Sequence, residues 1–153
     1  MFVTPPLGDW TLAVSAALFP PDRIETFAKP LVQELSGHFR DAQYFCTHKD
    51  AKLHAWARAQ KGKFVRGYAR DERSTPTVWS EGPQTKTERA LGFRFTDAPG
   101  APPAPPHPED VAIVDESCVF KLAALWSVDP SALDEHFAEP VAGLIGEFPL
   151  AKA

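Results

Sequence analysis

Four short strand-like segments follow one another in the middle of the chain and constrain its fold more than any other feature. They cover residues 42–48, 52–59, 63–70 and 75–82, are rich in aromatic residues, and are separated by turn residues. Short runs of this kind at close spacing are typical of an antiparallel meander, in which each strand pairs with the next one along the chain. The centre of the chain therefore predicts an antiparallel sheet.

The turn in "AQKGK" decides which residues of the second and third segments pair, and two turns fit the sequence. A two-residue turn at Lys61-Gly62 places Ala57 beside Arg66, whereas a three-residue loop with Gly62 in the left-handed conformation places Ala57 beside Val65. The shorter turn is of type I′ and needs a positive φ at lysine, which is unfavourable for a residue with a side chain. We therefore expect the three-residue loop.

This hairpin has two unlike faces, because side chains alternate along a strand. One face is small and apolar and suits a helix lying close on the sheet: Leu53, Ala55, Ala57, Val65, Gly67 and Ala69. The other carries large aromatic and basic side chains: His54, Trp56, Arg58, Phe64, Arg66, Tyr68 and Arg70. We expect Trp79 of the fourth segment to join this second face.

Segments before the meander predict a buried first strand and then a helix. Residues 9–19 alternate apolar and β-branched residues, and "PPDRIETFAKPLVQELSGHF" follows with an apolar residue every three or four positions. Asp22 and Glu25 form a capping-box variant at the helix start, Pro30 is expected to kink the helix, and Gly37 is a plausible stop.

Segments after the meander predict further helices. Thr85 and Glu88 form a second capping box ahead of a short helix. A longer helix is expected to start after Pro108, with Glu109 and Asp110 in its first turn, where the helix dipole favours acidic groups. Asp129 is expected to cap one more helix. Strand, helix, four strands and then helices is an α+β order, so we predict an antiparallel meander sheet of about five strands with helices packed on one face.

The chain length of 153 residues is that of a single domain, and we treat residues 1–153 as one. Six of the sixteen prolines fall between residues 99 and 108, so the Pro/Ala-rich stretch 97–108 is expected to be a surface loop between the sheet region and the C-terminal helices. No segment has the length and apolar character of a membrane span or a signal peptide. We expect a soluble cytoplasmic protein.

Charge is distributed unevenly along the chain. The net charge is −4, which disfavours a general nucleic-acid binder. Residues 40–94 carry twelve Lys and Arg against six Asp and Glu, a local charge of +6, whereas residues 109–147 carry nine acidic residues against Lys121 alone, a local charge of −8. The two regions face each other or are simply solvated, or one of them steers an oppositely charged partner.

The sequence contains no pattern that predicts an active site. No phosphate-binding loop, nucleophile elbow or zinc-protease motif occurs, and the two cysteines, Cys46 and Cys118, lie in apolar runs and are expected to be buried thiols. His48 and His54 lack a third ligand, so no metal site is predicted. An acid–base pair of His54 and Glu81 is conceivable, but half-exposed structural histidines are favoured. We predict no catalytic residue, no cofactor and no enzyme.

The aromatic and basic face of the hairpin has three interpretations. The C-terminal helices cover it, with arginine stems packed over the rings. Alternatively, it binds a protein, because Trp, Tyr and Arg dominate interface hot spots. Single-stranded nucleic acid is the third and least favoured interpretation, since the chain is acidic and lacks an RNP-like sequence.

Six short sequence blocks stand out in this chain: a Tyr-Phe strand, the "HAWAR" strand, a basic-aromatic strand, a W-x-E-G turn, "ERALGF" and a terminal W-S-x-D-P. They are residues 43–48, 54–58, 65–70, 79–82, 88–93 and 126–130. Together they resemble a family of small uncharacterised bacterial proteins in the immunity-protein pool of polymorphic toxins, including toxins delivered by type VI secretion. The family has no catalytic motif to carry over, and the resemblance implies a cytosolic inhibitor.

We therefore expect an immunity protein that binds a cognate toxin domain and occludes its active site, with no nucleic-acid or membrane partner and no prediction about self-association. Two surfaces are candidates for the contact. The sheet face would anchor the complex, through His54, Trp56, Arg58, Arg66, Tyr68 and Trp79. The acidic C-terminal region would steer encounter, through Glu109, Asp110, Asp115, Glu116, Asp134 and Glu135. The alternative is a small enzyme or ligand-binding domain with a pocket between sheet and helices.

Overall fold

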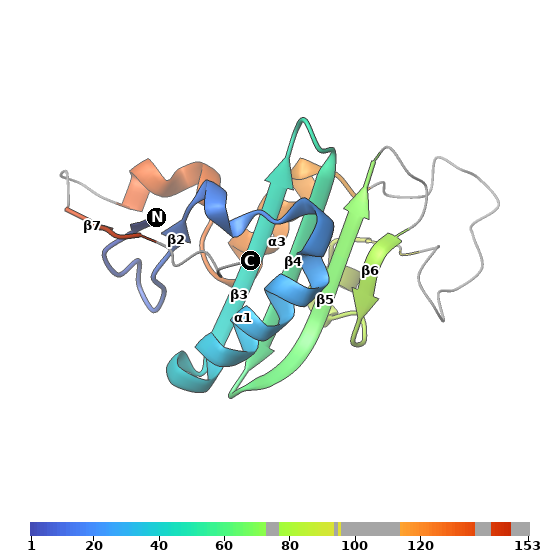
Figure 1. The fold of residues 1–153 in the computed structure, drawn as a ribbon, viewed down its shortest axis with the longest axis horizontal. Coiled ribbons are helices and arrows are strands. Elements are labelled where there is room, and N and C mark those ends of the chain that lie inside the picture. Colours follow the sequence, from blue (N-terminus) through green and yellow to red (C-terminus); the bar gives the residue numbers. More distant parts are fainter. Residues whose placement is uncertain (73–76, 94, 96–113, 137–141, 148–153) are drawn as a thin grey trace.

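A four-stranded antiparallel sheet forms the centre of the protein (Figure 1). The computed structural model describes residues 1–72, 77–93, 95, 114–136 and 142–147, apart from the side chains of residues 21 and 134–136. The sheet order is β3-β4-β5-β6, as a meander requires, and the strands are β3 (Asp41–His48), β4 (Leu53–Gln60), β5 (Lys63–Asp71) and β6 (Thr77–Glu81). The expected stretch 97–108 lies outside the described residues.

The β4–β5 turn has two residues, so the expected three-residue loop was wrong. Gln60 pairs with Lys63, and the residues between them, Lys61 and Gly62, have φ values of 51° and 76°. Two consecutive positive φ angles are those of a type I′ turn, whose twist matches the twist of the strands. The strand pairing outweighs the steric cost of a left-handed lysine.

A β-bulge next to this turn separates two residues that we expected on one face. Val65 is an extra residue on β5, because the pairing with β4 shifts between Phe64 and Arg66. Phe64 consequently stacks on Trp79, at 5.7 Å between ring centroids, on the opposite face of the sheet from Arg66. A bulge adds one residue to one strand and so reverses the facing of everything beyond it.

Helix α1 (Ile24–Phe39) covers the small-residue face of the sheet, as the sequence predicted. Its buried residues are Ile24, Ala28, Val32 and Ser36, which pack on the alanines of β4 and β5. Small side chains on the sheet let the helix backbone come close, which explains why alanine occupies every second position of β4.

The limits of α1 differ from those expected. The helix follows a short 3-10 turn, η2 (Pro21–Arg23), and its N-cap Arg23 makes no side-chain capping bond, so the predicted box of Asp22 and Glu25 is absent. The helix also continues past Gly37 to Phe39 and ends with Arg40 at a φ of 74°.

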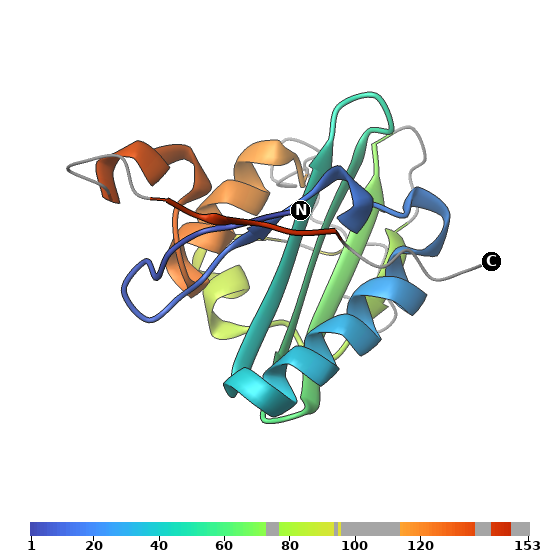
Figure 2. The same cartoon turned by 60° about the vertical axis from the view of Figure 1, so that its left-hand side comes forward.

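The other face of the sheet is covered by α2 (Lys86–Ala90) and α3 (Glu116–Trp126) (Figure 2). The predicted capping box of Thr85 and Glu88 is present at the start of α2. Helices therefore lie on both faces, and the α+β class is confirmed while the single helical layer is wrong. The layer formed by α2 and α3 encloses an aromatic core with Trp56 and Tyr68 at its centre.

The described part of α3 begins eight residues later than the predicted start at Pro108. Asp115 is its N-cap and accepts a hydrogen bond from the backbone N–H of Cys118. On this helix Leu122 is fully buried, whereas Leu125 is exposed. After α3, Asp129 accepts from the backbone N–H of Ser131 at the start of η4 (Pro130–His136), where a cap was predicted.

A second, smaller sheet joins the two ends of the described chain. Its order is β2-β1-β7, from β1 (Phe2–Val3), β2 (Ala13–Val14) and β7 (Leu144–Ile145), and it lies to one side of the main sheet (Figure 1). The predicted buried strand over residues 9–19 is thus only two residues long and exposed, and the 3-10 turn η1 (Ala16–Leu18) follows it. The outer surface of this small sheet is a main feature of the site below.

Candidate protein-binding surface

The sheet face predicted to meet a partner is buried inside the protein. Trp56, Arg66 and Tyr68 have exposed fractions of 0%, 2% and 1%. Phe93, Phe95 and α3 cover them, and the rings of Trp56 and Tyr68 lie 4.8 Å apart. Of the three interpretations of this face, the covering by the chain's own helices is the correct one, and the prediction that it is free to contact a partner was wrong.

A buried ion pair explains why an arginine lies within this aromatic core. The Nε of Arg66 donates to Oε1 of Glu88 at 2.9 Å, and its Nη1 donates to four oxygens, among them the Gly82 carbonyl at 3.2 Å. The guanidinium also lies over the Phe95 ring, 4.8 Å from its centroid. A buried charge is tolerated only when it is paired and hydrogen-bonded, and this one meets both conditions.

Two further residues predicted for the partner contact, Arg58 and Trp79, instead contact other residues of this protein. Arg58 donates through Nε and Nη2 to both carboxylate oxygens of Asp41, at 3.2 and 2.6 Å, and lies over the Trp126 ring. Trp79 is 5% exposed and belongs to the core under α1, on the other face of the sheet, because it pairs directly with Ala69 of the small-residue face.

The His54 imidazole is held by hydrogen bonds at both ring nitrogens. Nδ1 lies 2.9 Å from the Thr47 hydroxyl, and Nε2 lies 2.7 Å from Oε1 of Glu72. The hydrogen bond with His54 is the main reason that the pKa of Glu72 is lowered, and Lys52, whose Nζ is 3.3 Å away, adds to the effect. With both nitrogens engaged and 4% of the residue exposed, His54 is suited to holding β4 and β5 together rather than to transferring protons.

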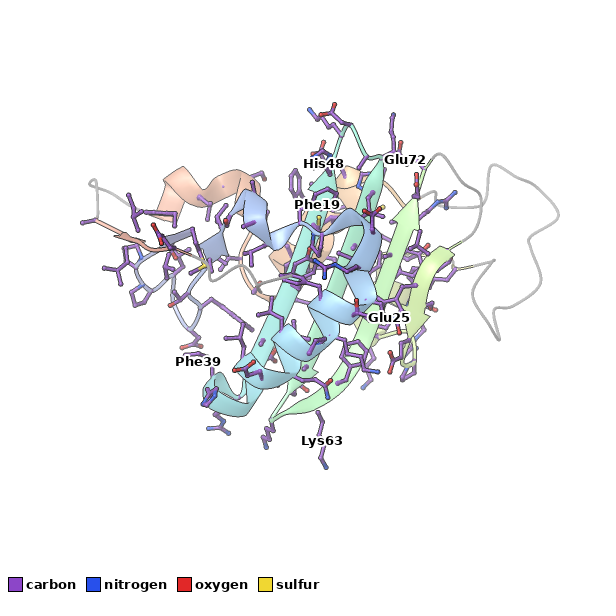
Figure 3. The ribbon with its side chains drawn as sticks, in the orientation of Figure 1. Phe19, Glu25, Phe39, His48, Lys63 and Glu72 are labelled. Carbon is purple, nitrogen blue, oxygen red and sulfur yellow. The ribbon has the colours of Figure 1, made fainter. Side chains whose placement is uncertain are left out.

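His54 and Glu81 do not form an acid–base pair, the less favoured possibility in the sequence, because Glu81 lies 2.5 Å from the Nζ of Lys29 instead. His48 does not meet His54 either: its ring stacks on Phe19, with 4.3 Å between the ring centroids (Figure 3). Within the described residues, no group of three or more potential ligands could hold a metal ion.

The two thiols have little nucleophilic character. Burial raises the pKa of Cys46 and that of Cys118, and Cys118 is one of the buried core residues under α3. Burial also raises the pKa of Tyr44, which donates its hydroxyl to the Leu18 carbonyl at 2.7 Å. A thiol with a raised pKa is mostly protonated near neutral pH and is a poor nucleophile.

The acidic region predicted to steer a partner is only partly described. Asp115 is an exposed residue of this region. Partial burial of its carboxylate would by itself raise the pKa, but hydrogen bonds from the Ser117 hydroxyl and the Cys118 amide together have the larger effect and lower the pKa of Asp115. Glu116 is half-buried in the first turn of α3. Glu109 and Asp110 lie outside the described residues, as do the side chains of the other two, Asp134 and Glu135.

The small sheet carries four of the large apolar side chains that are exposed among the described residues. The exposed fractions are 41% for Phe2, 56% for Val14, 74% for Leu144 and 88% for Ile145. Leu144 pairs with Val3 and so lies on the opposite face of the sheet from Ile145, and we call Phe2, Val14 and Ile145 the apolar sheet surface. Large apolar side chains that gather on exposed strands mark a site of contact with another molecule more often than scattered ones do.

The pairing of the small sheet places these three residues in one row. Phe2 on the central strand pairs with Val14 on one side and with Ile145 on the other, so all three side chains lie on the same face. Gly143 allows this packing, because a Cβ there would lie 2.3 Å from the Phe2 ring. No sequence pattern indicated this row, because its strands have two residues each and are far apart along the chain.

An aromatic core fills the space between the sheet and α3, where the alternative function would require a pocket. A hollow of about 400 Å³ lies on the outer side of α3. Its lining includes Leu91 after α2 and Phe120 and Leu125 of α3, together with two ionisable residues, Lys121 and Asp129.

Comparisons with known proteins leave the family of the chain unassigned. No protein-family model, no curated protein and no solved structure matches it. Among the helices that the structure describes, none has both the length and the apolar character needed to cross a membrane.

Proposed function

We propose that this protein binds another protein through the apolar sheet surface, and that it acts as an immunity protein that neutralises a bacterial toxin. The observation that supports the protein contact is the exposed row of Val14, Phe2 and Ile145. The resemblance of the sequence blocks to immunity proteins supports the choice of a toxin as the partner. The proposal replaces the buried sheet face with the small sheet as the surface of contact.

Burial of these side chains is the driving force that the proposal requires. Complete burial of one valine, leucine, isoleucine or phenylalanine side chain contributes about 1.5–3 kcal/mol. Three such residues on one face of the small sheet supply the apolar centre of an interface, which a polar rim then surrounds. Thr11 and Glu147, both exposed, flank the strands and provide polar groups for such a rim.

The position of the surface also suits an inhibitor. The small sheet lies beside the main sheet rather than within its layers, so a partner can approach it without disturbing the core under α1 or α3 (Figure 1). An inhibitor needs only to cover the entrance of an active site, and a rigid apolar surface can do so without a catalytic group of its own. Inhibition then follows from the strength of binding.

The test is a rescue assay with the toxin domain encoded next to this chain's gene. Cells that produce the toxin domain should grow when they also produce the unaltered protein. The double variant Val14→Ser and Ile145→Ser should fail to restore growth, and its affinity in calorimetry should fall by about 2 kcal/mol or more, which is about thirtyfold. Its melting temperature should stay close to that of the unaltered protein, because both side chains are exposed.

Val78→Ser is the matched control, because Val78 is 48% exposed but lies on β6 in the main sheet. This variant should restore growth fully. Equal affinity of the double variant and the unaltered protein would exclude the apolar sheet surface as the contact. Failure of the unaltered protein to restore growth would exclude this toxin as the partner.

A further inference from the structure

A second exposed surface lies at the end of the main sheet where α1 ends and the β4–β5 hairpin turns (Figures 2 and 3). It consists of His38, Phe39 and Arg40 at the end of α1 and Lys61 and Lys63 at the hairpin turn, and we call it the basic pole. All five residues are exposed. It belongs to neither the apolar sheet surface nor the buried ion pairs.

Backbone hydrogen bonds hold the two parts of the basic pole together. The N–H of Lys61 donates to the Arg40 carbonyl at 2.7 Å, and the N–H of Gly62 donates to the buried Ser36 hydroxyl at 3.0 Å. The helix end and the hairpin turn therefore keep a fixed spacing. The backbone positions that carry the basic side chains are therefore fixed relative to one another.

The cations of the basic pole have no acidic partner within the described residues. Arg40, Lys61 and Lys63 are absent from the ion pairs of the structure, whereas Lys29, Lys52, Arg58 and Arg66 each have a carboxylate partner. Asp41 directly follows Arg40, but its carboxylate is occupied by Arg58 at 2.6 Å and by the Gln60 side chain at 2.7 Å. Among the described residues, no carboxylate neutralises these three cations, so they can pair with the carboxylates of another molecule.

Two of these cations occupy backbone positions that favour other residues. Arg40 has a φ of 74° and Lys61 a φ of 51°. Glycine or asparagine adopts such angles at lower cost, and both are preferred at a helix end and in a type I′ turn. Folding alone does not select a cation at either position, and residues held in unfavourable backbone conformations cluster at sites of function.

Phe39 adds an aromatic ring to the basic residues of the basic pole. It is 73% exposed, at the last position of α1, and its ring lies edge-on to the His38 ring, with 6.4 Å between the ring centroids. An aromatic residue among cations is suited to a partner that carries carboxylates beside an apolar side chain. Four basic residues on a chain of net charge −4 are a small footprint for nucleic acid.

We propose that the basic pole binds an acidic segment of a protein, with carboxylates on Arg40, Lys61 and Lys63 and an apolar side chain on Phe39. The proposal concerns a surface separate from the apolar sheet surface. It holds or fails independently of the toxin.

The test uses the complete protein and a short fluorescein-labelled oligoglutamate peptide with one central leucine, followed by fluorescence anisotropy at low and at physiological ionic strength. The unaltered protein should bind the peptide, more weakly at the higher ionic strength. The double variant Arg40→Gly and Lys61→Asn should bind about tenfold more weakly, yet melt at the same or a higher temperature, because it loses two charges and gains favourable backbone residues. Phe39→Ser should remove any preference for the leucine peptide over one with serine in its place.

The double variant Lys49→Asn and Lys86→Asn is the matched control, since it removes two exposed lysines from other parts of the surface. It should bind the peptide as the unaltered protein does. Equal weakening by the control, or no binding by the unaltered protein, would overturn the proposal. A lower melting temperature of Arg40→Gly and Lys61→Asn would assign these cations to folding, and tighter binding of a thymidine oligonucleotide of equal charge would assign the pole to nucleic acid.

Discussion

The indole N–H of Trp56 donates to Oε1 of Glu88 at 2.9 Å, and the same oxygen accepts from the Nε of Arg66. The second oxygen of Glu88 accepts from the backbone N–H of Thr85 at 2.6 Å and so completes the capping box of α2. One fully buried carboxylate thus connects the sheet, the aromatic core and the start of a helix.

Removal of this carboxylate should be among the most damaging single changes in the protein. Glu88→Ala leaves Arg66 charged and buried without its partner, and we expect a loss of about 3–5 kcal/mol in the free energy of unfolding. Urea denaturation followed by tryptophan fluorescence measures it. Lys86→Ala, on the exposed side of the same helix, should change stability by less than about 0.5 kcal/mol. A loss below about 1 kcal/mol for Glu88→Ala would show that the pair contributes little.

Gly67→Ala should destabilise the sheet by crowding its neighbours. A Cβ at this position would lie 2.2 Å from two ring carbons of Trp79 and 2.7 Å from the Phe64 ring, far inside van der Waals contact. Overpacking of this kind costs about 1–3 kcal/mol, which the free energy of unfolding in urea would report. Gly37→Ala is the opposite case, since nothing lies within 4 Å and the residue is helical, so it should gain about 0.5–1 kcal/mol. Equal effects of the two changes would contradict the structure.

The hydrogen bond between His54 and Glu72 predicts a dependence of stability on pH. The pKa of Glu72 is lower in the folded protein than in the unfolded chain, where it is about 4.3. The stabilisation is therefore complete above the unfolded pKa and is lost as the pH falls through the lowered folded pKa. Thermal melts of the unaltered protein and of Glu72→Gln should differ most near neutral pH and converge in acid. A difference that stays constant over this range would exclude the linkage.

The capping box at α2 can be tested separately from the buried ion pair. The Thr85 hydroxyl accepts from the backbone N–H of Glu88 at 3.2 Å, so Thr85→Ala should cost about 1 kcal/mol. Thr85→Ser keeps the accepting oxygen and should retain most of the stability. Chemical denaturation of both variants distinguishes the cap from the loss of a methyl group, which the two variants share. Equal losses in both would mean that the hydroxyl does not act as a cap.

Features that depend on neighbouring residues were predicted well from the sequence. The four strands of the meander, the small-residue face under α1 and the box of Thr85 and Glu88 follow from patterns within a few positions of one another. The register of β5 did not follow, because one extra residue, Val65, reverses the facing of Phe64 relative to Arg66. Neither local propensity nor alternation contains that information.

The position of the partner surface depends on contacts between distant parts of the chain. An aromatic and basic strand face fits a partner interface and an internal core equally well, and what decides between them is whether another segment covers it. Here Phe93, Phe95 and α3 do so. The apolar sheet surface was missed for the opposite reason, since Phe2 and Ile145 meet only after the whole domain has folded.

The pairing of β1 with β7 has a consequence for biosynthesis. β1 precedes the four strands of the meander along the chain, and its partner β7 is synthesised only after all of them. The meander can form meanwhile, because its pairs are close along the chain, whereas the pairing of β1 with β7 must wait. A translation product that ends before β7 would therefore carry a folded centre without the row that joins Phe2 to Ile145.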